Sequence, residues 1–237
     1  MTTKRFDQHG PAKPVSIPVE DVVLHGDFRM VSDARGLVIF VHGSGSSRFS
    51  PRNRFVAEEL NKQGLATLLL DLLTEQEHKV DEQTMQHRFD IPMLARRATL
   101  VAAWAQRQPE MGRLPIGLFG ASTGAAAALI AAANLRGEIA AVVSRGGRAD
   151  LAEDALGKVK APSLLIVGGE DEVVLDLNKI AMARMHCATR LHVVPGATHL
   201  FEEPGTLEEV ATAAAQWFVK YMKDFALPAP PKAVGWK

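Results

Sequence analysis

The sequence contains a single cysteine, Cys187, so no disulfide can form within the chain. A chain without disulfides fits a reducing compartment, and we expect a cytoplasmic protein. The first residues, MTTKRFDQHG, are polar and lack the apolar segment of a secretory signal peptide. No apolar run approaches the roughly 20 residues that a membrane-spanning helix needs. These absences exclude a disulfide-stabilised secreted scaffold and predict no association with a membrane.

The chain also lacks an excess of charge of either sign, because 27 Lys and Arg residues balance 27 Asp and Glu residues. Nucleic-acid binding depends on a basic surface, so we expect no nucleic-acid partner. The 237 residues suffice for one substantial α/β domain, whereas two would be cramped. We expect one domain over residues 1–237, with extended tails at 1–13 and 226–237, as a monomer or a homodimer.

Short runs rich in Val, Ile and Leu recur along the chain, at residues 37–42, 66–71, 116–120, 139–144, 163–168 and 190–195. They are continuously apolar rather than alternating, which is typical of strands buried on both faces of a parallel sheet. Segments with helical periodicity separate them, at 54–63, 92–108, 122–134, 176–185 and 206–221. This alternation predicts an α/β fold with a doubly wound, mostly parallel sheet flanked by helices.

Two further segments depart from that alternation. Residues 15–19 and 24–30 resemble a leading pair of antiparallel strands at the N-terminus. Residues 72–88 are polar, charged and only weakly periodic, so we expect an irregular excursion on the surface above the strand ends. We also expect this excursion to form one wall of any pocket there.

The segment LFGASTGAAAALI, residues 118–130, places Ser122 between an apolar strand and an alanine-rich helix. Gly120, Ser122 and Gly124 form the G-x-S-x-G pattern of a nucleophile elbow, in which the serine occupies a sharp, strained turn. The glycines keep side chains away where strand and helix crowd together. Alternatively, Ser122 only caps the helix, since serine is favoured at that position.

A nucleophilic serine needs a base, and the base needs a group that orients it. Asp171 and His199 each follow one of the last two strand-like runs, in the chain order Ser, acid, His that α/β hydrolases use. Both loops open at the same edge of a parallel sheet, which predicts a catalytic triad. As the alternative, Asp171 is a solvated loop carboxylate beside Glu170 and Glu172, and His199 has no catalytic role.

The triad also needs two backbone amides that stabilise the oxyanion of the tetrahedral intermediate. The amide of Thr123, directly after the serine, would supply the first. The loop HGSGSS, residues 42–47, follows an early strand and would supply the second. We favour the amide of Ser44 for this role, with that of Gly45 as the alternative.

The same loop has a rival interpretation as a nucleotide site. Gly43 and Gly45 directly after a strand imitate a dinucleotide-binding fingerprint. The third glycine of that fingerprint is missing, because Arg48 occupies its place and is too bulky for close helix–strand packing. Nucleotide binding would also leave the three triad candidates unexplained, so the sequence favours the hydrolase.

With these residues in place, the chain resembles the α/β-hydrolase superfamily, and its compactness is similar to the dienelactone-hydrolase-like branch, which has little or no lid. The segments HGSGSSR, LLLDLLT and SRGGRADL are similar to a bacterial subgroup of that branch, some of whose members carry a fused phosphoribosyltransferase-like domain. We expect no such second domain here. The resemblance implies Ser122 as nucleophile, Asp171 as acid and His199 as base. Dienelactone hydrolases proper carry cysteine at the elbow, so a serine argues for a different ester, and Cys187 is expected to be a small buried residue.

Two arginines are candidates for substrate binding. Arg145 follows another strand at the same sheet edge, and its planar guanidinium suits a substrate carboxylate. Alternatively, Arg145 and Arg148 pair with structural carboxylates such as Asp150 or Glu153. Arg48 has the same two interpretations.

The sequence thus predicts a serine hydrolase that cleaves small carboxylic esters through an acyl-enzyme intermediate, with no metal and no organic cofactor. The same machinery could act on thioesters or peptides, or transfer the acyl group to an acceptor other than water. Outside enzymes, the fold could serve as a non-catalytic binding or regulatory module, because fold alone does not prove function.

Overall fold

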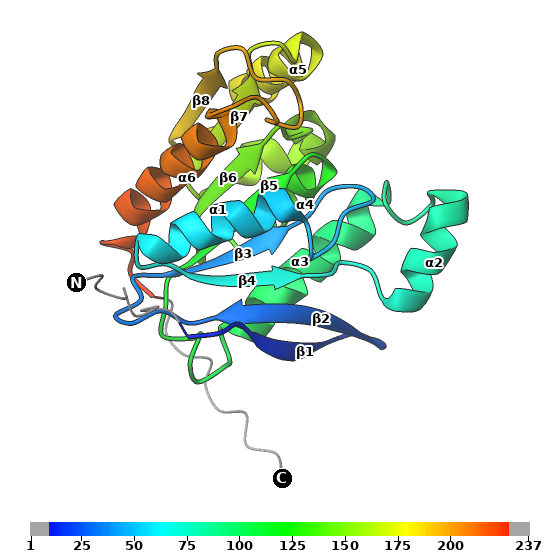
Figure 1. Ribbon diagram of the computed structural model, residues 1–237, viewed down its shortest axis with the longest axis vertical. Coiled ribbons are helices and arrows are strands. Elements are labelled where there is room, and N and C mark those ends of the chain that lie inside the picture. Colours follow the sequence, from blue (N-terminus) through cyan, green and yellow to red (C-terminus); the bar gives the residue numbers. More distant parts are fainter. Residues whose placement is uncertain (1–9, 228–237) are drawn as a thin grey trace, which may run out of the picture.

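The computed structural model describes residues 10–227 (Figure 1). Its single sheet has eight strands in the order β1-β2-β4-β3-β5-β6-β7-β8. The strands are β1 (Lys13–Val19), β2 (Val22–Arg29), β3 (Leu37–Val41), β4 (Ala66–Leu70), β5 (Ile116–Ala121), β6 (Ile139–Arg145), β7 (Ser163–Gly168) and β8 (Thr189–Val194). The helices are α1 (Pro51–Lys62), α2 (Glu75–Thr84), α3 (Ile91–Ala105), α4 (Thr123–Asn134), α5 (Glu172–Ala183) and α6 (Thr206–Met222), with a 3₁₀ segment η1 (Ala149–Lys158).

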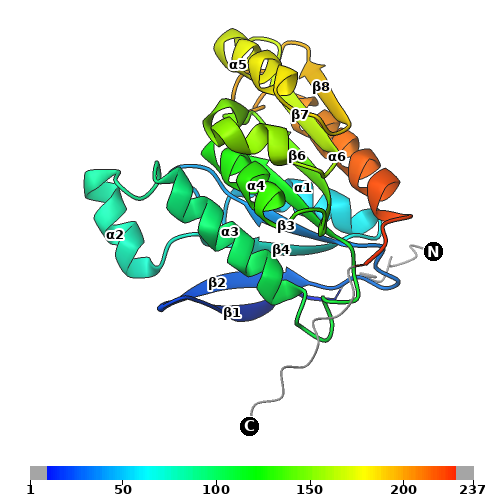
Figure 2. The same cartoon turned by 180° about the vertical axis from the view of Figure 1, so that it is seen from behind.

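Strands β3 to β8 are parallel, whereas β1 and β2 pair antiparallel and join the sheet antiparallel to β4. The predicted doubly wound sheet with leading antiparallel strands is therefore confirmed. Helices α1 and α6 cover one face of the sheet, and α3 and α4 cover the other (Figure 1, Figure 2). Each face has its own hydrophobic core, because the central strands are buried along their whole length.

Helix α4 packs close to the sheet because seven of its twelve residues are alanine. All but two of its twelve residues are buried. A Cβ atom added to Gly120 would lie 2.5 Å from the Ala125 Cα, and one added to Gly124 would lie 2.2 Å from the Val41 carbonyl oxygen. Both positions therefore require glycine, and the strand–helix contact holds the turn at Ser122 between them.

The excursion at residues 72–88 differs from the prediction, because it contains the helix α2 rather than only irregular chain. A capping box starts this helix: Thr74 Oγ1 accepts the Glu77 amide at 3.2 Å, and a Glu77 carboxylate oxygen accepts the Thr74 amide at 2.8 Å. The Thr74-x-x-Glu77 pattern was readable in the sequence, but the helix has no apolar stripe. Helix α2 projects beyond the layered body in both views (Figure 1, Figure 2).

Smaller corrections concern boundaries. Helix α5 begins at Glu172 rather than at residue 176, and α1 begins at Pro51, which suits the first helical turn. Segment η1 was not predicted. Lys13 belongs to β1 rather than to a tail, and the rest of the predicted tails lies mostly outside the described residues.

Within residues 10–227 there is no helix whose length and apolar content would let it cross a bilayer.

We expect Gly124→Ala to destabilise the protein by about 3 kcal/mol, because backbone atoms of the neighbouring strand block the new methyl group. Urea unfolding measures this difference. Gly157→Ala is the control, since its added Cβ would lie at an ordinary contact distance of 3.6 Å from the Arg184 carbonyl oxygen and should cost less than about 1 kcal/mol. Equal effects of the two substitutions would contradict the close packing of α4.

Candidate active site

Ser122 lies at the turn between β5 and α4 in a strained backbone conformation. Its φ is 50° and its ψ is −125°, a region that a residue with a side chain rarely occupies and that costs about 1–3 kcal/mol. Ser122 precedes the first residue of α4, yet its hydroxyl makes no capping hydrogen bond. The capping alternative therefore does not explain the serine, whereas backbone strain at a partly buried serine whose hydroxyl has no capping role is typical of a nucleophile elbow.

Asp171 and His199 lie in the loops after β7 and β8 and contact each other directly. The distance from His199 Nδ1 to Asp171 Oδ2 is 2.6 Å. The Asp171 side chain is largely buried, at 15% exposure, and that of His199 is 40% exposed. A carboxylate can only accept, so Nδ1 carries the proton and Nε2 keeps its lone pair free for a reacting proton.

Gly146, directly after β6, lies next to both Ser122 and His199. The Ser122 amide donates to the Arg145 carbonyl oxygen at 3.2 Å, beside Gly146. A Cβ on Gly146 would lie 3.6 Å from His199 Cε1. Within residues 10–227, no hydrogen bond joins Ser122 to His199. The elbow and the Asp171–His199 pair thus adjoin each other at one sheet edge.

The loop at residues 42–47 packs against the elbow. A Cβ on Gly43 would lie 2.9 Å from the Ser122 Cβ. The amide of Thr123, the first residue of α4, has no acceptor within the helix and is available to an oxyanion. The Ser44 amide, in contrast, donates to the Thr123 hydroxyl at 3.0 Å. Gly45 has a φ of +64° in a turn closed by the hydrogen bond from the Ser46 amide to the Gly43 carbonyl.

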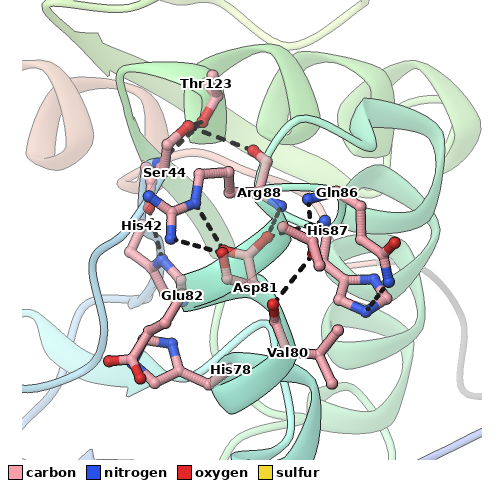
Figure 3. A network of polar contacts seen from close by, with 12 residues as sticks. His42, Ser44, His78, Val80, Asp81, Glu82, Gln86, His87, Arg88 and Thr123 are labelled. Atoms are coloured by element: carbon pink, nitrogen blue, oxygen red, sulfur yellow. Dashed lines mark hydrogen bonds and ion pairs between the residues drawn. The ribbon is translucent and has the colours of Figure 1, made fainter.

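The excursion supplies two residues near this loop that the sequence did not single out, Asp81 and Arg88 (Figure 3). The Ser44 hydroxyl donates to the Arg88 carbonyl oxygen at 3.2 Å, and Arg88 forms an ion pair with buried Asp81 at 2.6 Å. No sequence pattern marks a pair seven residues apart in a segment without periodicity, so the sequence offered no signal for it.

A cavity of about 340 Å³ opens between the loop at 42–47 and the start of the excursion. Its lining is mixed: His25, His42, Ser46, Ser47, Arg48, Phe49, Asp71, Leu73, Thr74, Glu75 and His78. The excursion thus forms one wall of a cavity, beside the loop expected to hold an oxyanion. Among residues 10–227, no group of three or more His, Cys, Asp or Glu side chains is arranged to hold a metal ion.

His42 joins the start of this loop to the excursion. Its Nδ1 lies 2.9 Å from the Gly43 carbonyl oxygen, and the Leu72 amide donates to its Nε2 at 2.9 Å. Nε2 accepts, so Nδ1 is the protonated nitrogen of a neutral ring. Burial at 6% exposure lowers the pKa of His42 below its ordinary value, despite the opposing hydrogen bond to Gly43.

The two candidate substrate-binding arginines differ in their surroundings. The Arg48 guanidinium forms ion pairs with Asp71 and with Asp27, and its amide donates to Asp71 Oδ1 at 2.7 Å. Its positive charge is therefore balanced within the protein. These contacts favour the structural interpretation of Arg48, although its part in substrate binding stays a prediction.

Arg145 has no such balance. It is 8% exposed, its buried Nη1 atom has no hydrogen-bond partner, and it pairs with no carboxylate in the described part of the chain. Burial, helped by the charge of Arg52, lowers the pKa of Arg145 to about 10. Arg148, in contrast, pairs with Asp150 through hydrogen bonds of 2.9 and 2.7 Å, as its structural interpretation requires. Cys187 lies partly buried beyond the end of α5, away from the elbow.

Comparisons with known proteins agree with the fold. The model of the dienelactone hydrolase family matches residues 29–226. The chain is 50% identical to a dienelactone hydrolase from Anabaena variabilis, covering 90% of this chain and 99% of that one with a TM-score of 0.89. Est1E from Butyrivibrio proteoclasticus shares the fold, with a TM-score of 0.74 over 90% of this chain and 99% of its own, at 19% identity.

A protein of Mycobacterium tuberculosis that is named as a candidate phosphoribosyl transferase is 54% identical over 208 residues. The match covers 88% of this chain but 46% of that protein. The chain therefore spans about half the length of the curated relatives it matches, and their name describes a longer protein.

We expect the stability of the protein to fall below pH 6.5 partly because of His42. Its pKa is lowered in the folded state, so the unfolded chain takes up the proton first as the pH falls from 6.5. The stability difference between wild type and His42→Gln, which cannot titrate, should therefore be largest near pH 7.5 and shrink toward pH 5. Urea unfolding at each pH measures it, with exposed His186→Gln as the control. A difference that is constant with pH would contradict the burial of a neutral imidazole.

Proposed function

The chain belongs to the dienelactone hydrolase family, and on that premise we propose that it is a serine hydrolase that cleaves small carboxylic esters. Family and fold indicate a hydrolase of the esterase type. The observation that carries the finer proposal is the strained, uncapped Ser122 beside a histidine whose Nδ1 is held by Asp171 at 2.6 Å. A hydroxyl that serves no structural purpose, on a turn that costs free energy, is accounted for by chemistry at that atom.

In the proposed reaction, Ser122 Oγ attacks the ester carbonyl carbon while His199 Nε2 takes the hydroxyl proton. Asp171 keeps the imidazole in the required tautomer and stabilises the imidazolium that forms. The oxyanion accepts hydrogen bonds from the Thr123 amide and from an amide of the loop at 42–47. The leaving alcohol takes the proton from His199. Water, deprotonated by the same nitrogen, then attacks the acyl-enzyme and releases the acid and the serine.

Two alternatives keep the same fold, and one of them also keeps the catalytic residues. Thioesters or peptides could replace the ester, and an acceptor other than water could take the acyl group. A binding or regulatory module would keep the fold but would not require a reactive serine. The phosphoribosyl transferase name of the mycobacterial relatives covers chain beyond the match, so it does not alter the proposal for this region.

We expect Ser122→Ala to lower kcat by about 10⁴-fold or more and to abolish labelling by a fluorophosphonate probe. Hydrolysis of p-nitrophenyl esters of increasing acyl length measures activity and narrows the substrate. Ser50→Ala is the matched control, because Ser50 Oγ caps α1 by accepting the Asn53 amide at 3.3 Å. This control should lose about 1 kcal/mol of stability and keep its labelling.

The outcomes of the labelling and hydrolysis experiments distinguish the serine hydrolase from its alternatives. Folded wild-type protein that the probe does not label at Ser122 would contradict the serine hydrolase and favour the binding module. Labelling without release of p-nitrophenol from any ester would favour the thioesterase, peptidase or acyltransferase alternatives.

We also propose that Arg145 binds an anionic group of the substrate. A buried guanidinium without a carboxylate partner is costly unless a ligand supplies the counter-charge. We expect Arg145→Met to lower kcat/KM for a p-nitrophenyl ester that carries a free carboxylate by about 10²-fold, and to leave the neutral ester of equal length nearly unchanged. Equal losses on both esters would contradict this role. Removal of an unpaired buried charge should also leave the melting temperature unchanged or higher.

A further inference from the structure

Besides the hydrogen bond from the Leu72 amide to His42, the excursion contacts the oxyanion loop through Arg88, which lies between α2 and α3. Here we define the oxyanion loop as residues 42–47. Figure 3 shows Arg88 between Asp81 on one side and Ser44 with Thr123 on the other. The Ser44 hydroxyl donates to the Arg88 carbonyl oxygen at 3.2 Å, and the two hydroxyl oxygens of Ser44 and Thr123 lie 2.9 Å apart. A continuous polar connection therefore runs from α2 to the residue that follows Ser122.

The direction of each hydrogen bond in this connection follows from its chemistry. A carbonyl oxygen can only accept, so the Ser44 hydroxyl proton points to Arg88. The Thr123 hydroxyl must then donate to Ser44 Oγ, and it accepts the Ser44 amide at 3.0 Å. Each hydroxyl thus donates once and accepts once. The Arg88 carbonyl oxygen fixes the direction of both hydrogen bonds because it can only accept.

The position of that carbonyl oxygen depends on Asp81. The Asp81 side chain is buried and accepts the amides of His87 and Arg88 at 2.8 and 2.9 Å. Its other oxygen accepts Arg88 Nε at 2.6 Å, and Arg88 Nη2 donates to the Asp81 carbonyl oxygen at 3.0 Å. One buried carboxylate therefore folds the turn after α2 around itself and orients the backbone of Arg88.

Arg88 meets the oxyanion loop at a second point. A Cβ atom added to Gly45 would lie 3.3 Å from Arg88 Nη1, so the guanidinium packs over the turn at Gly45. The carbonyl and the side chain of one residue thus contact two successive residues of the loop. These are the two residues whose amides are candidates for the second oxyanion donor.

Hydrogen bonds stabilise the ionised form of the Asp81 carboxylate. Burial alone would disfavour its ionised form, but hydrogen bonds from the Arg88 amide and guanidinium and from the His87 amide outweigh burial and lower the pKa of Asp81. The carboxylate is therefore charged at neutral pH, which strengthens its hold on the turn.

We propose that Asp81 and Arg88 are positioning residues for the proposed ester hydrolysis, because they hold the oxyanion loop against the elbow through Ser44. The proposal rests on the proposed function, and neither residue touches the reacting atoms. Oxyanion donors act only when they are fixed where charge develops, and a displacement of about 1 Å can cost 10²-fold in rate. Loss of the turn around Asp81 would release Ser44 and the amides beside it.

A second ion pair in the same excursion provides a matched control. Arg97, in α3, contacts Glu77 of α2 through hydrogen bonds of 2.6 and 2.7 Å, and it donates to the Leu72 carbonyl at 2.7 Å. This pair fastens α2 to the body of the protein. Neither residue contacts the oxyanion loop directly, because Leu72, whose amide donates to His42 Nε2, lies between them and the loop. Arg97 lowers the pKa of Glu77 to about 2, so both carboxylates are charged partners of an arginine. Asp81→Asn and Glu77→Gln therefore make the same chemical change at two ends of one element.

We expect Asp81→Asn to lower kcat by about 10- to 100-fold and to leave KM within about twofold of wild type. Its affinity for an alkyl boronic acid, which mimics the tetrahedral intermediate, should fall by a similar factor. Glu77→Gln should lower the melting temperature yet keep kcat. Equal kcat in the two variants, or a loss confined to KM, would overturn the proposal.

A double-mutant cycle tests the route. Ser44→Ala removes the hydroxyl but keeps the amide, so it breaks the connection to Arg88 at its centre. If Asp81 acts through Ser44, the double variant Asp81→Asn/Ser44→Ala is no slower than Ser44→Ala alone. Effects that multiply would show that Asp81 acts by another route and would overturn the proposal.

Amide hydrogen exchange gives a readout that does not need activity. We expect Asp81→Asn to speed exchange in residues 42–47, and Glu77→Gln to leave it as in wild type. Unchanged exchange in Asp81→Asn would overturn the positioning role even in an active enzyme, whereas an unlabelled Ser122 in wild type would defeat the proposed function alone. Arg88→Met keeps the carbonyl and both backbone hydrogen bonds to Asp81, and it should give a smaller effect of the same kind should Asp81→Asn fail to fold.

Discussion

The close contact between helix α4 and strands β3 and β5 is the constraint on which the candidate site depends. Gly120 and Gly124 allow the helix to approach until backbone meets backbone, with no space for even a methyl group at either position. The chain between them can turn only by placing Ser122 at a positive φ, where its hydroxyl cannot cap the helix. The strain of this turn is held by the packing of a buried, alanine-rich helix and by backbone hydrogen bonds of Ser122 to Arg145, Ala125 and Arg148.

The parallel sheet explains why residues far apart in the sequence share one edge. Strands β3, β5, β6, β7 and β8 all end at that edge, so the oxyanion loop, the elbow, Gly146, Asp171 and His199 follow from the topology alone. The positions of the loop, the elbow, Asp171 and His199 could be predicted from the sequence because each one follows an apolar run, whereas the place of Gly146 between them could not. The sequence also predicted the sheet and most helices, since the period of the apolar residues changes clearly between strand and helix.

Apart from segment η1, the structure that the sequence could not predict lies mainly in the excursion. Helix α2 has no apolar stripe, and its stability comes from the capping box at Thr74 and from the pairing of Glu77 with Arg97 in another helix. Asp81 and Arg88 likewise matter only because a turn folds them together and a distant loop lies beside them. The surroundings of Arg145 and Arg148 could not be predicted either, because they depend on the folded structure. Only two glycines separate these arginines in the sequence, yet Arg145 is buried without a partner and Arg148 pairs with Asp150.

If the Ser44 amide, one of the two candidates, is the second oxyanion donor, its hydrogen bond to the Thr123 hydroxyl has a consequence for how it discriminates between the bound ester and the transition state. An amide that already has an acceptor gains almost nothing by exchanging it for the neutral carbonyl of a bound ester, since the two acceptors are of similar strength. A developing negative charge is a stronger acceptor and can compete for the same proton. Such an amide would contribute little to the binding of the substrate. It would contribute most of its free energy to the transition state, where the negative charge develops, and only this kind of interaction accelerates a reaction.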